Sequence, residues 1–442
     1  MTGPPATVPT GVPKSKVAAW ALWDCGSTGM NAIVATFVFS VYLTGTVGVG
    51  LDSDTSPASW LGRTLTISGI TVALLAPLTG VLVQVPHRRR VALTVLTALA
   101  VVFTASMVLI RADPRYLAPG LVLLALTAAC GDLASVPYNA MLRQLTTPQT
   151  AGRISGLGWA AGYTGSVVLL LLIYVGFIAG DGPTRGLLHV PVEDGWYVRA
   201  AMVLAACWLA VLSLPLLISA PSFAGATPDR NVPGGVLGAY RRLWADLRGE
   251  WHRDRNFVYY LVVSAVFRDG LAGIFAFGAV LGVSVYGISQ ADVLIFGVIA
   301  STVAALGAVL GGRLDDRVGA KPVIVVSLTA LIVVGLTLMA LSGPLAFWIC
   351  GLALCLFVGP TQSAARTLLL RMTGEGKEGV AFGLYTMTGR AAAPLAPWLF
   401  FVFVDLFHAD RAGLAGICLV LAIGLAGMIL VRVDGPVRTQ QA

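Results

Sequence analysis

Charged residues are scarce in this chain. They make up 11% of its 442 residues, whereas a soluble globular protein carries roughly 25%. Hydrophobic residues account for 57% of the sequence, and the mean hydropathy is +0.84. This balance excludes a water-soluble enzyme or binding module. It predicts an all-α membrane protein that crosses the bilayer many times.

The residues that catalysis and metal binding require are also few. The chain has four His and six Cys, and the cysteines lie in apolar stretches without a CxxC or Cys/His pattern. Neither a disulfide framework nor a zinc site is indicated. The glycine-rich spacings at 156–162 follow no strand and precede no Walker lysine, so a nucleotide-driven pump is rejected. We therefore expect no enzyme activity, no metal and no cofactor.

Long hydrophobic runs are what the sequence does contain. A membrane-spanning helix needs ~20 mostly apolar residues, and twelve stretches meet that length. They predict twelve transmembrane helices at 17–43, 60–84, 91–110, 116–142, 153–178, 196–219, 257–286, 291–312, 322–342, 345–371, 379–407 and 411–434.

The basic residues collect on one side of these spans. If the amino terminus is cytoplasmic, 20 of the 29 Lys and Arg lie in cytoplasmic segments, six lie in outer loops and three lie within spans. The positive-inside rule then places both termini in the cytoplasm, and we expect a multi-pass protein of the plasma membrane. The net charge of +8 reflects this topology, so we expect lipid and a small molecule as partners, but no nucleic acid. We expect a monomer.

The two halves of the chain contain similar sequences. Asp24 is followed by an apolar run that ends in SVY at Tyr42, and Asp269 is followed by one that ends in SVY at Tyr286. Internal repeats of this kind are typical of transporters. The predicted organisation is a disordered tail at 1–16, six-helix bundles at 17–219 and 257–434 separated by a linker at 220–256, and a tail at 435–442.

The linker is basic and amphipathic. Its apolar residues recur at spacings of three and four, which predicts a helix on the inner membrane surface rather than a calmodulin-like partner site. These residues are Leu237, Tyr240, Trp244, Leu247 and Trp251, and the basic ones are Arg241, Arg242, Arg248 and Arg253. Six spans, a linker and six spans resemble the layout of the major facilitator superfamily.

The loop after the eighth predicted span reads GRLDDRVGAK and resembles the inter-helix loop of that superfamily, G-x-x-x-D-R-x-G-x-[KR]. Its matching residues are Gly312, Asp316, Arg317, Gly319 and Lys321. A glycine lets two helices approach closely, and the acid can hold a cationic partner in one conformation. We interpret the loop as a conformational latch. The alternative is a loop that only sets topology.

The corresponding loop of the first half reads GVLVQVPHRRR. Gly80 is kept, Gln84 stands where the acid is expected, and Arg88, Arg89 and Arg90 follow. A latch here would depend on amide hydrogen bonds or on the arginines.

Further segments narrow the resemblance. They are WALWD at 20–24, YNAML at 138–142, GRISGLGWAAGYTG at 152–165, FRDGLAGIFAFG at 267–278, GPTQ at 359–362 and FGLY at 382–385. Together they resemble the vacuolar amino-acid effluxer family of fungi and its bacterial relatives, over about Trp20 to Gly435. The resemblance implies the major facilitator fold and amino-acid transport. Gln84, Cys25 and Arg268 depart from the residues usual in that family.

Three acids and three bases lie inside the predicted spans. They are Asp24, Asp132 and Asp269, and Arg268, Arg366 and Arg390. Ionised side chains at membrane depth normally face a protein interior or a hydrated cavity. Their net charge of zero is compatible with a binding site for a zwitterionic solute, and equally with ion pairs among these side chains.

Individual roles can be proposed for these charges. Asp132 lies roughly 16 Å from the inner face and is a candidate for proton coupling, with a structural ion pair as the alternative. Asp24 and Asp269 occupy matched positions on the first helix of each half, which in this superfamily lines the central cavity. Arg390 is the best candidate for binding a carboxylate, because a guanidinium can donate two parallel hydrogen bonds to it. Arg268 is expected to pair with another span.

Polar and aromatic residues near these charges complete the candidate site. The set is Tyr138, Asn139, Trp159, Tyr163, Gln362 and Tyr385, with Arg366 six residues after Pro360 as Arg143 is after Pro137. Amides here could bind solute or join helices, and packing is the default role of aromatics in a membrane.

The sequence therefore predicts a secondary transporter that binds a small polar solute, of the amino-acid class by resemblance, and works by alternating access. A proton gradient is the hypothesised driving force. Efflux of an amphipathic compound is an alternative within the same fold. A membrane receptor or scaffold without transport is an alternative of another class.

Overall fold

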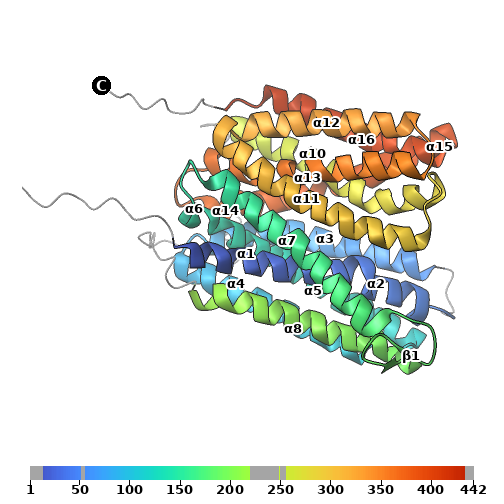
Figure 1. The fold of residues 1–442 in the computed structure, drawn as a ribbon. Helices are drawn as coiled ribbons and strands as arrows, with labels where there is room; N and C mark the ends of the chain where they lie inside the picture. Colours follow the sequence, from blue (N-terminus) through green and yellow to red (C-terminus); the bar gives the residue numbers. More distant parts are fainter. Residues whose placement is uncertain (1–12, 51–54, 220–247, 249–254, 434–442) are drawn as a thin grey trace, which may run out of the picture.

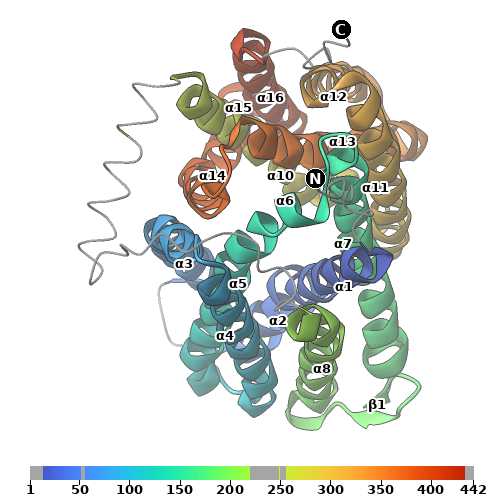
Figure 2. The same cartoon turned by 90° about the vertical axis from the view of Figure 1, so that its left-hand side faces the viewer.

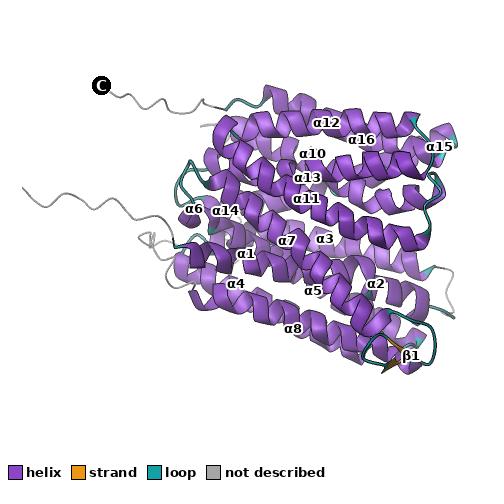
Figure 3. Cartoon of the chain, in the orientation of Figure 1, coloured by secondary structure: helices purple, strands orange, loops and turns teal. Residues whose placement is uncertain are grey.

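The computed structural model describes residues 13–50, 55–219, 248 and 255–433. The predicted amphipathic linker helix, with Leu237, Tyr240, Trp244 and Trp251, lies outside these residues, as do most of both predicted tails. The described part of the chain is helical apart from one short hairpin (Figure 3). Twelve of its helical segments are long and apolar enough to cross a membrane.

The first half of the chain contributes six of these spans. Its elements are α1 (Lys14–Asn31), η1 (Ala32–Phe37), α2 (Phe39–Tyr42), η2 (Leu43–Val47), α3 (Pro57–Leu82), α4 (Pro86–Ser106), η3 (Met107–Leu109), η4 (Pro114–Tyr116), α5 (Leu117–Ala140), α6 (Leu142–Leu145), α7 (Ala151–Ile173), η5 (Tyr174–Ile178), β1 (Thr184–Arg185), β2 (Val190–Pro191), η6 (Glu193–Gly195) and α8 (Trp196–Ser219). β1 and β2 pair antiparallel.

The second half contributes the other six. Its elements are α10 (Arg255–Ser284), α11 (Gln290–Val318), α12 (Ala320–Ala340), α13 (Pro344–Met372), α14 (Glu378–Ala392), α15 (Leu395–Phe407), η8 (Asp410–Ala412) and α16 (Gly413–Leu430). Helices of the first half and helices of the second half form two groups that lie side by side (Figures 1 and 2).

Each predicted span coincides with a helical segment of the structure. The first helix begins at Lys14, inside the segment predicted as a tail, and the eighth continues to Val318, six residues past its predicted end. Serines cap two of the helix starts: Ser56 Oγ accepts from Ser59 N at 3.2 Å, and Ser289 Oγ accepts from Asp292 N at 3.1 Å. Gly319, at φ 91°, ends α11 in a conformation that favours glycine.

The eleventh span, predicted as one helix, is broken. α14 ends at Ala392 and α15 begins at Leu395, with Pro394 between them. Proline lacks the N–H that would continue the helical ladder. The first span is also irregular, because two of its segments, η1 and η2, are π-helical.

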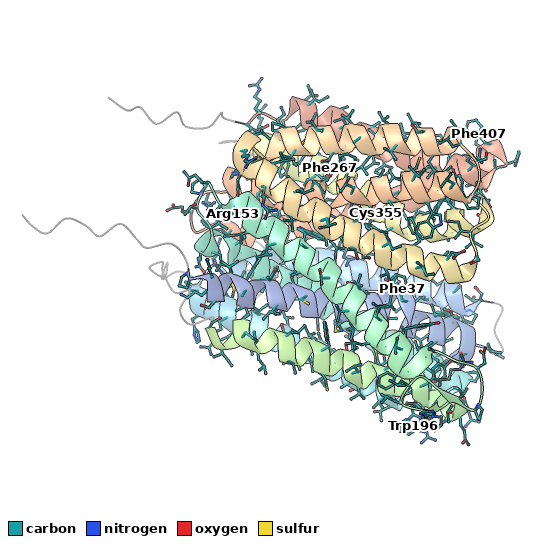
Figure 4. All side chains as sticks on the ribbon, viewed as in Figure 1. Phe37, Arg153, Trp196, Phe267, Cys355 and Phe407 are labelled. Carbon is teal, nitrogen blue, oxygen red and sulfur yellow. The ribbon has the colours of Figure 1, made fainter. Side chains whose placement is uncertain are left out.

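The spans run alternately in opposite directions, so α1 begins and α16 ends on the same side of the molecule (Figure 1). We call this side the terminal face, and it is the side that Figure 2 presents. Arg153 lies near it, whereas Trp196 and Phe407 lie near the opposite face (Figure 4). Leu74, Val326 and Trp398 are 59%, 63% and 61% exposed, which is the exposure expected of side chains that meet lipid.

Candidate functional site

Arg366 of α13 reaches out of its own half and into the other. Its Nε donates to Ser155 Oγ at 3.0 Å, and its Nη2 donates to the Ser155 carbonyl at 2.7 Å. Its Nη1 donates to Asn139 Oδ1 at 3.0 Å and lies 3.9 Å from Asp24 Oδ2. One guanidinium therefore links the second half to α1, α5 and α7 of the first. We call this set the Arg366 network.

Aromatic rings enclose the network. The Arg366 guanidinium lies 5.0 Å from the Trp20 ring and 5.5 Å from the Trp159 ring. Tyr138 stacks on Trp20 with a centroid separation of 4.5 Å and on Trp23 at 4.3 Å, and Trp20 Nε1 donates to the Tyr138 carbonyl at 3.1 Å. Tyr138 and Trp20 are buried, so they act here as walls that exclude water from the ion pair.

A second ion pair joins the halves. Arg390 of α14 donates through Nη2 to Asp132 Oδ2 of α5. Arg390 lies ~18 Å along α14 from Glu378, at ~1.5 Å rise per residue, which is near the middle of a membrane span. Its side chain is 40% exposed and that of Asp132 is 27% exposed, whereas the Arg366 side chain is 6% exposed. This mid-depth pair, Asp132–Arg390, is thus the more accessible of the two.

The segment around Arg390 is only partly covered: residues 385–389 and 392 are half-buried, and 390, 391, 393 and 394 are exposed. None of the residues 385–394 is buried, over more than two helical turns. Arg390 itself faces the other half, since its guanidinium bonds the carboxylate of Asp132 on α5. Tyr163 of α7 and Phe275 of α10 also join the two halves, with ring centroids 6.3 Å apart.

Arg268 packs against α14 instead of pairing with an acid. Its guanidinium lies 3.5 Å from the Tyr385 ring centroid, and its Nη2 donates to the Tyr385 carbonyl at 3.1 Å. Its Nη1 is buried without an acceptor among the described residues, and so is Nε1 of Trp159. Buried donors without acceptors are uncommon in native proteins. Both are therefore candidates for contact with a polar ligand.

Asp269 does not join the other acids. It is 6% exposed, and its Oδ2 accepts from the backbone N–H of Ala396 at 2.5 Å, in the first turn of α15. We expected Asp24 and Asp269 to line one central cavity from matched positions, but the structure gives the two acids different surroundings. Asp24 faces the Arg366 network, whereas Asp269 satisfies a backbone donor where Pro394 breaks the eleventh span.

Small residues bring the two halves into backbone contact near the terminal face. A Cβ added at Gly80 of α3 would lie 2.5 Å from the Gly379 carbonyl of α14, and one at Gly383 would lie 2.6 Å from the Ala76 carbonyl. The crossing of α7 with α11 is built alike from Gly152 and Gly156 against Ala308 and Gly312. Small residues four apart allow such close approach in membrane helices.

The loop of the second half contributes one contact to the crossing of α7 with α11. Asp316 Oδ1 accepts from Gly152 N at 2.7 Å and Oδ2 accepts from Arg153 N at 3.1 Å, at the N terminus of α7. The partner of Asp316 is thus a helix N terminus and not the cation that we expected. Lys321 Nζ donates to the carbonyls at the end of α16, at Ile429 and Val431, and Arg317 is exposed.

The loop of the first half turns one arginine inward. Arg89 is 4% exposed, and its Nε donates to the Val83 carbonyl at 3.0 Å, whereas Arg88 is exposed. Glu378, at the start of α14, is an acid that sequence reasoning missed. Its Oε1 lies 2.6 Å from Arg143 Nε, and its Oε2 lies 4.0 Å from Arg89 Nη2. Glu378 directly precedes the span predicted at 379–407, and an acid at a helix start is the signal that the sequence offers.

The cross-half contacts share one location. Among the described residues, every hydrogen bond and ion pair between the halves lies between the terminal face and the middle of the spans. The structure is therefore closed at the terminal face. Gln362 and Tyr163, also candidates from the sequence, lie half-buried on α13 and α7.

Both the sequence and the fold resemble those of known proteins. The sequence matches the family "Vacuole effluxer Atg22 like" over residues 54–441. It is 21% identical over 408 residues, 92% of each chain, to the uncharacterized MFS-type transporter YxiO of Bacillus subtilis (strain 168). It is 24% identical over 313 residues to autophagy-related protein 22 of Yarrowia lipolytica, covering 63% of this chain and 50% of that one.

Solved structures share the fold at low identity. The proton:xylose symporter XylE, bound to 6-bromo-6-deoxy-D-glucose, superimposes with a TM-score of 0.71 at 14% identity, over 95% of this chain and 96% of that one. FucP in the outward conformation superimposes with a TM-score of 0.66 at 13% identity, over 95% of this chain and all of that one.

Proposed function

Because the chain belongs to the Atg22-like vacuole effluxer family of the major facilitator superfamily, it is a membrane transporter, and we propose that its solute is a zwitterionic amino acid. The relatives and structural neighbours are transporters, so the prediction that the chain is not an enzyme is confirmed. The multi-pass membrane protein predicted from the sequence is confirmed as well.

One observation carries the choice of solute: an accessible acid–base pair bridges the two halves at the middle of the spans. A neutral zwitterion can enter the Asp132–Arg390 pair with its carboxylate on Arg390 and its ammonium on Asp132. Each of the two side-chain charges then keeps a partner, because the solute adds one charge of each sign. A solute with a single charge would leave one side chain unpaired at a depth where that is costly.

Two buried donors on other helices support the same solute. The buried Nη1 of Arg268 and Nε1 of Trp159 have no acceptor among the described residues, and a carboxylate supplies oxygen acceptors. The aromatic pair Tyr163 and Phe275, on opposite halves, can enclose an apolar side chain. A sugar offers hydroxyl groups but no charge, so it would not replace the ion pair.

Alternating access follows from the location of the contacts. The solute enters from the opposite face while the terminal face is closed. Opening of the terminal face separates the Arg366 network, because its donors and acceptors belong to different halves. A solute that occupies Asp132 and Arg390 removes one of the bonds that hold the halves together and so favours that movement.

Proton coupling through Asp132 is part of this proposal. Protonation neutralises the carboxylate and releases Arg390, which is the same release that a zwitterion produces. The terminal face is proposed to be cytoplasmic, because the loops on that side carry most of the Lys and Arg.

Counterflow in proteoliposomes tests the proposal. Vesicles loaded with unlabelled leucine should accumulate labelled leucine, whereas vesicles loaded with xylose or with an amphiphilic cation should not accumulate their labelled counterparts. Asp132→Asn should abolish leucine counterflow together with any response to a pH gradient, because the ammonium loses its partner, and Asp405→Asn, an exposed acid on the same span as Arg390, should leave both intact. Saturable counterflow of the sugar or the cation, without counterflow of leucine, would refute the amino-acid proposal.

A further inference from the structure

The two backbone crossings at the terminal face are related by the internal repeat of the chain. Gly152 and Gly156 lie in the first two turns of α7, and Gly379 and Gly383 hold the same positions in α14. Each pair faces small residues four apart, Ala308 and Gly312 on α11 or Ala76 and Gly80 on α3. Asp316 follows Gly312 by four residues, and Gln84 follows Gly80 by four residues.

The two crossings place negative charge differently. At the crossing of α7 with α11, the carboxylate of Asp316 lies against the N terminus of α7. At the crossing of α3 with α14, the backbone N of Gln84 lies 3.3 Å from the site of a Cβ on Gly379, so Gln84 occupies the corresponding place. An amide has no net charge to offer the helix N terminus. The first turn of α14 does carry an acid of its own, Glu378.

Glu378 is held by both halves. Its side chain is 5% exposed, and its two oxygens lie 2.6 Å from Arg143 and 4.0 Å from Arg89. Oε1 also accepts from Gly376 N at 3.1 Å. Arg143 in addition donates to the carbonyls of Leu370 and Thr373 at the end of α13. We call Glu378, Arg143 and Arg89 the Glu378 clasp.

We propose that Glu378 is the positioning residue that closes the crossing of α3 with α14, and that residue 84 is an amide because Glu378 supplies the negative charge of that crossing. An acid at position 84 would bring a second carboxylate beside Glu378, and the two would compete for Arg89 and Arg143. In this proposal the negative charge of the crossing lies on the helix and not on the loop that contacts it. The inference concerns the movement of the halves and does not depend on which solute is carried.

A double-variant series tests this inference through the conformation of the protein. Spin labels on Arg88→Cys and Arg317→Cys report the separation of the halves at the terminal face, because both residues are exposed and lie on different halves. The exposed Cys207 is replaced by Ser in this background. Distances are measured by pulsed electron paramagnetic resonance on the full chain in lipid nanodiscs.

Glu378→Gln should shift the population from the short distance toward the longer one by roughly 5- to 150-fold, the range of ordinary conformational coupling. Gln84→Asp alone should shift it the same way, and Gln84→Asp with Glu378→Gln should restore the short distance. Glu375→Gln, an exposed acid three residues before Glu378, is the matched control and should match the parent.

The outcomes separate the alternatives. A double variant that is as open as either single variant would overturn the proposal, because the two positions would then not share one charge. An equal shift in Glu375→Gln would overturn it too, since the effect would then be one of net charge. If Glu378→Gln does not fold, Gln84→Asp in the parent chain decides alone: a short distance retained there refutes the inference.

Discussion

Arg366→Lys tests most directly whether the Arg366 network holds the two halves together. Lysine keeps the positive charge near Asp24 but lacks the planar group whose three nitrogens donate to Ser155 and Asn139. Hydrogen bonds to a charged group contribute ~1.5–3 kcal/mol each, and an ammonium can replace only part of this set. Losing two of them while part of the ionic attraction remains weakens the closed terminal face by about 3 kcal/mol.

Hydrogen–deuterium exchange measures this loss directly. A decrease of ~3 kcal/mol in the free energy of opening raises the exchange rate of protected amides by ~150-fold, at 1.4 kcal/mol per factor of ten. The increase should appear in peptides from the start of α7 and the end of α13, which the Arg366 network joins.

Arg371→Lys is the matched control for this experiment. Arg371 lies on the same helix, and its partner Asp315 belongs to the same half, so its loss should leave α7 protected. Unchanged exchange in Arg366→Lys, or an equal increase in α7 for both variants, would refute the argument that Arg366 holds the halves together.

Two further predictions concern the backbone. Gly80→Ala should abolish transport while the protein still folds, because its Cβ meets the Gly379 carbonyl at 2.5 Å, and Gly69→Ala on the same helix, with nothing within 4 Å, should transport normally. Asp269→Ala should lower the stability by about 1–2 kcal/mol, measured as a fall in Tm, because the N–H of Ala396 loses its acceptor. Transport by Gly80→Ala at the parental rate, or an unchanged Tm for Asp269→Ala, would contradict these assignments.

The sequence predicts the fold well because hydrophobic length is a local property. All twelve predicted spans coincide with helical segments, and their ends differ by a few residues at most of the boundaries. The break at Pro394 was not predicted, because the eleventh span is otherwise apolar. A proline alone does not indicate a break, since Pro137 and Pro360 lie within continuous helices of this chain. Whether a proline interrupts a membrane helix depends on which neighbours satisfy the freed backbone groups, here Asp269.

The sequence identified most charged residues of the site but not their partners. Asp132 and Arg390 were both candidates, yet nothing local shows that they meet, because the pairing depends on how the halves dock. Glu378 was overlooked because it directly follows a polar turn, where an acid is expected to be solvated. Its burial arises from Arg143 and Arg89 of the other half, which only the tertiary structure brings together.

The central claim is that a zwitterion replaces the bond between Asp132 and Arg390, and equilibrium binding to the purified transporter tests it most directly. Leucine should bind saturably, and both leucinamide, which lacks the carboxylate, and N-acetyl-leucine, which lacks the ammonium, should fail to compete at a hundredfold excess. Arg390→Gln should bind none of the three. If either derivative competes as well as leucine, or if Arg390→Gln binds leucine normally, the mid-depth pair is not where the solute is held.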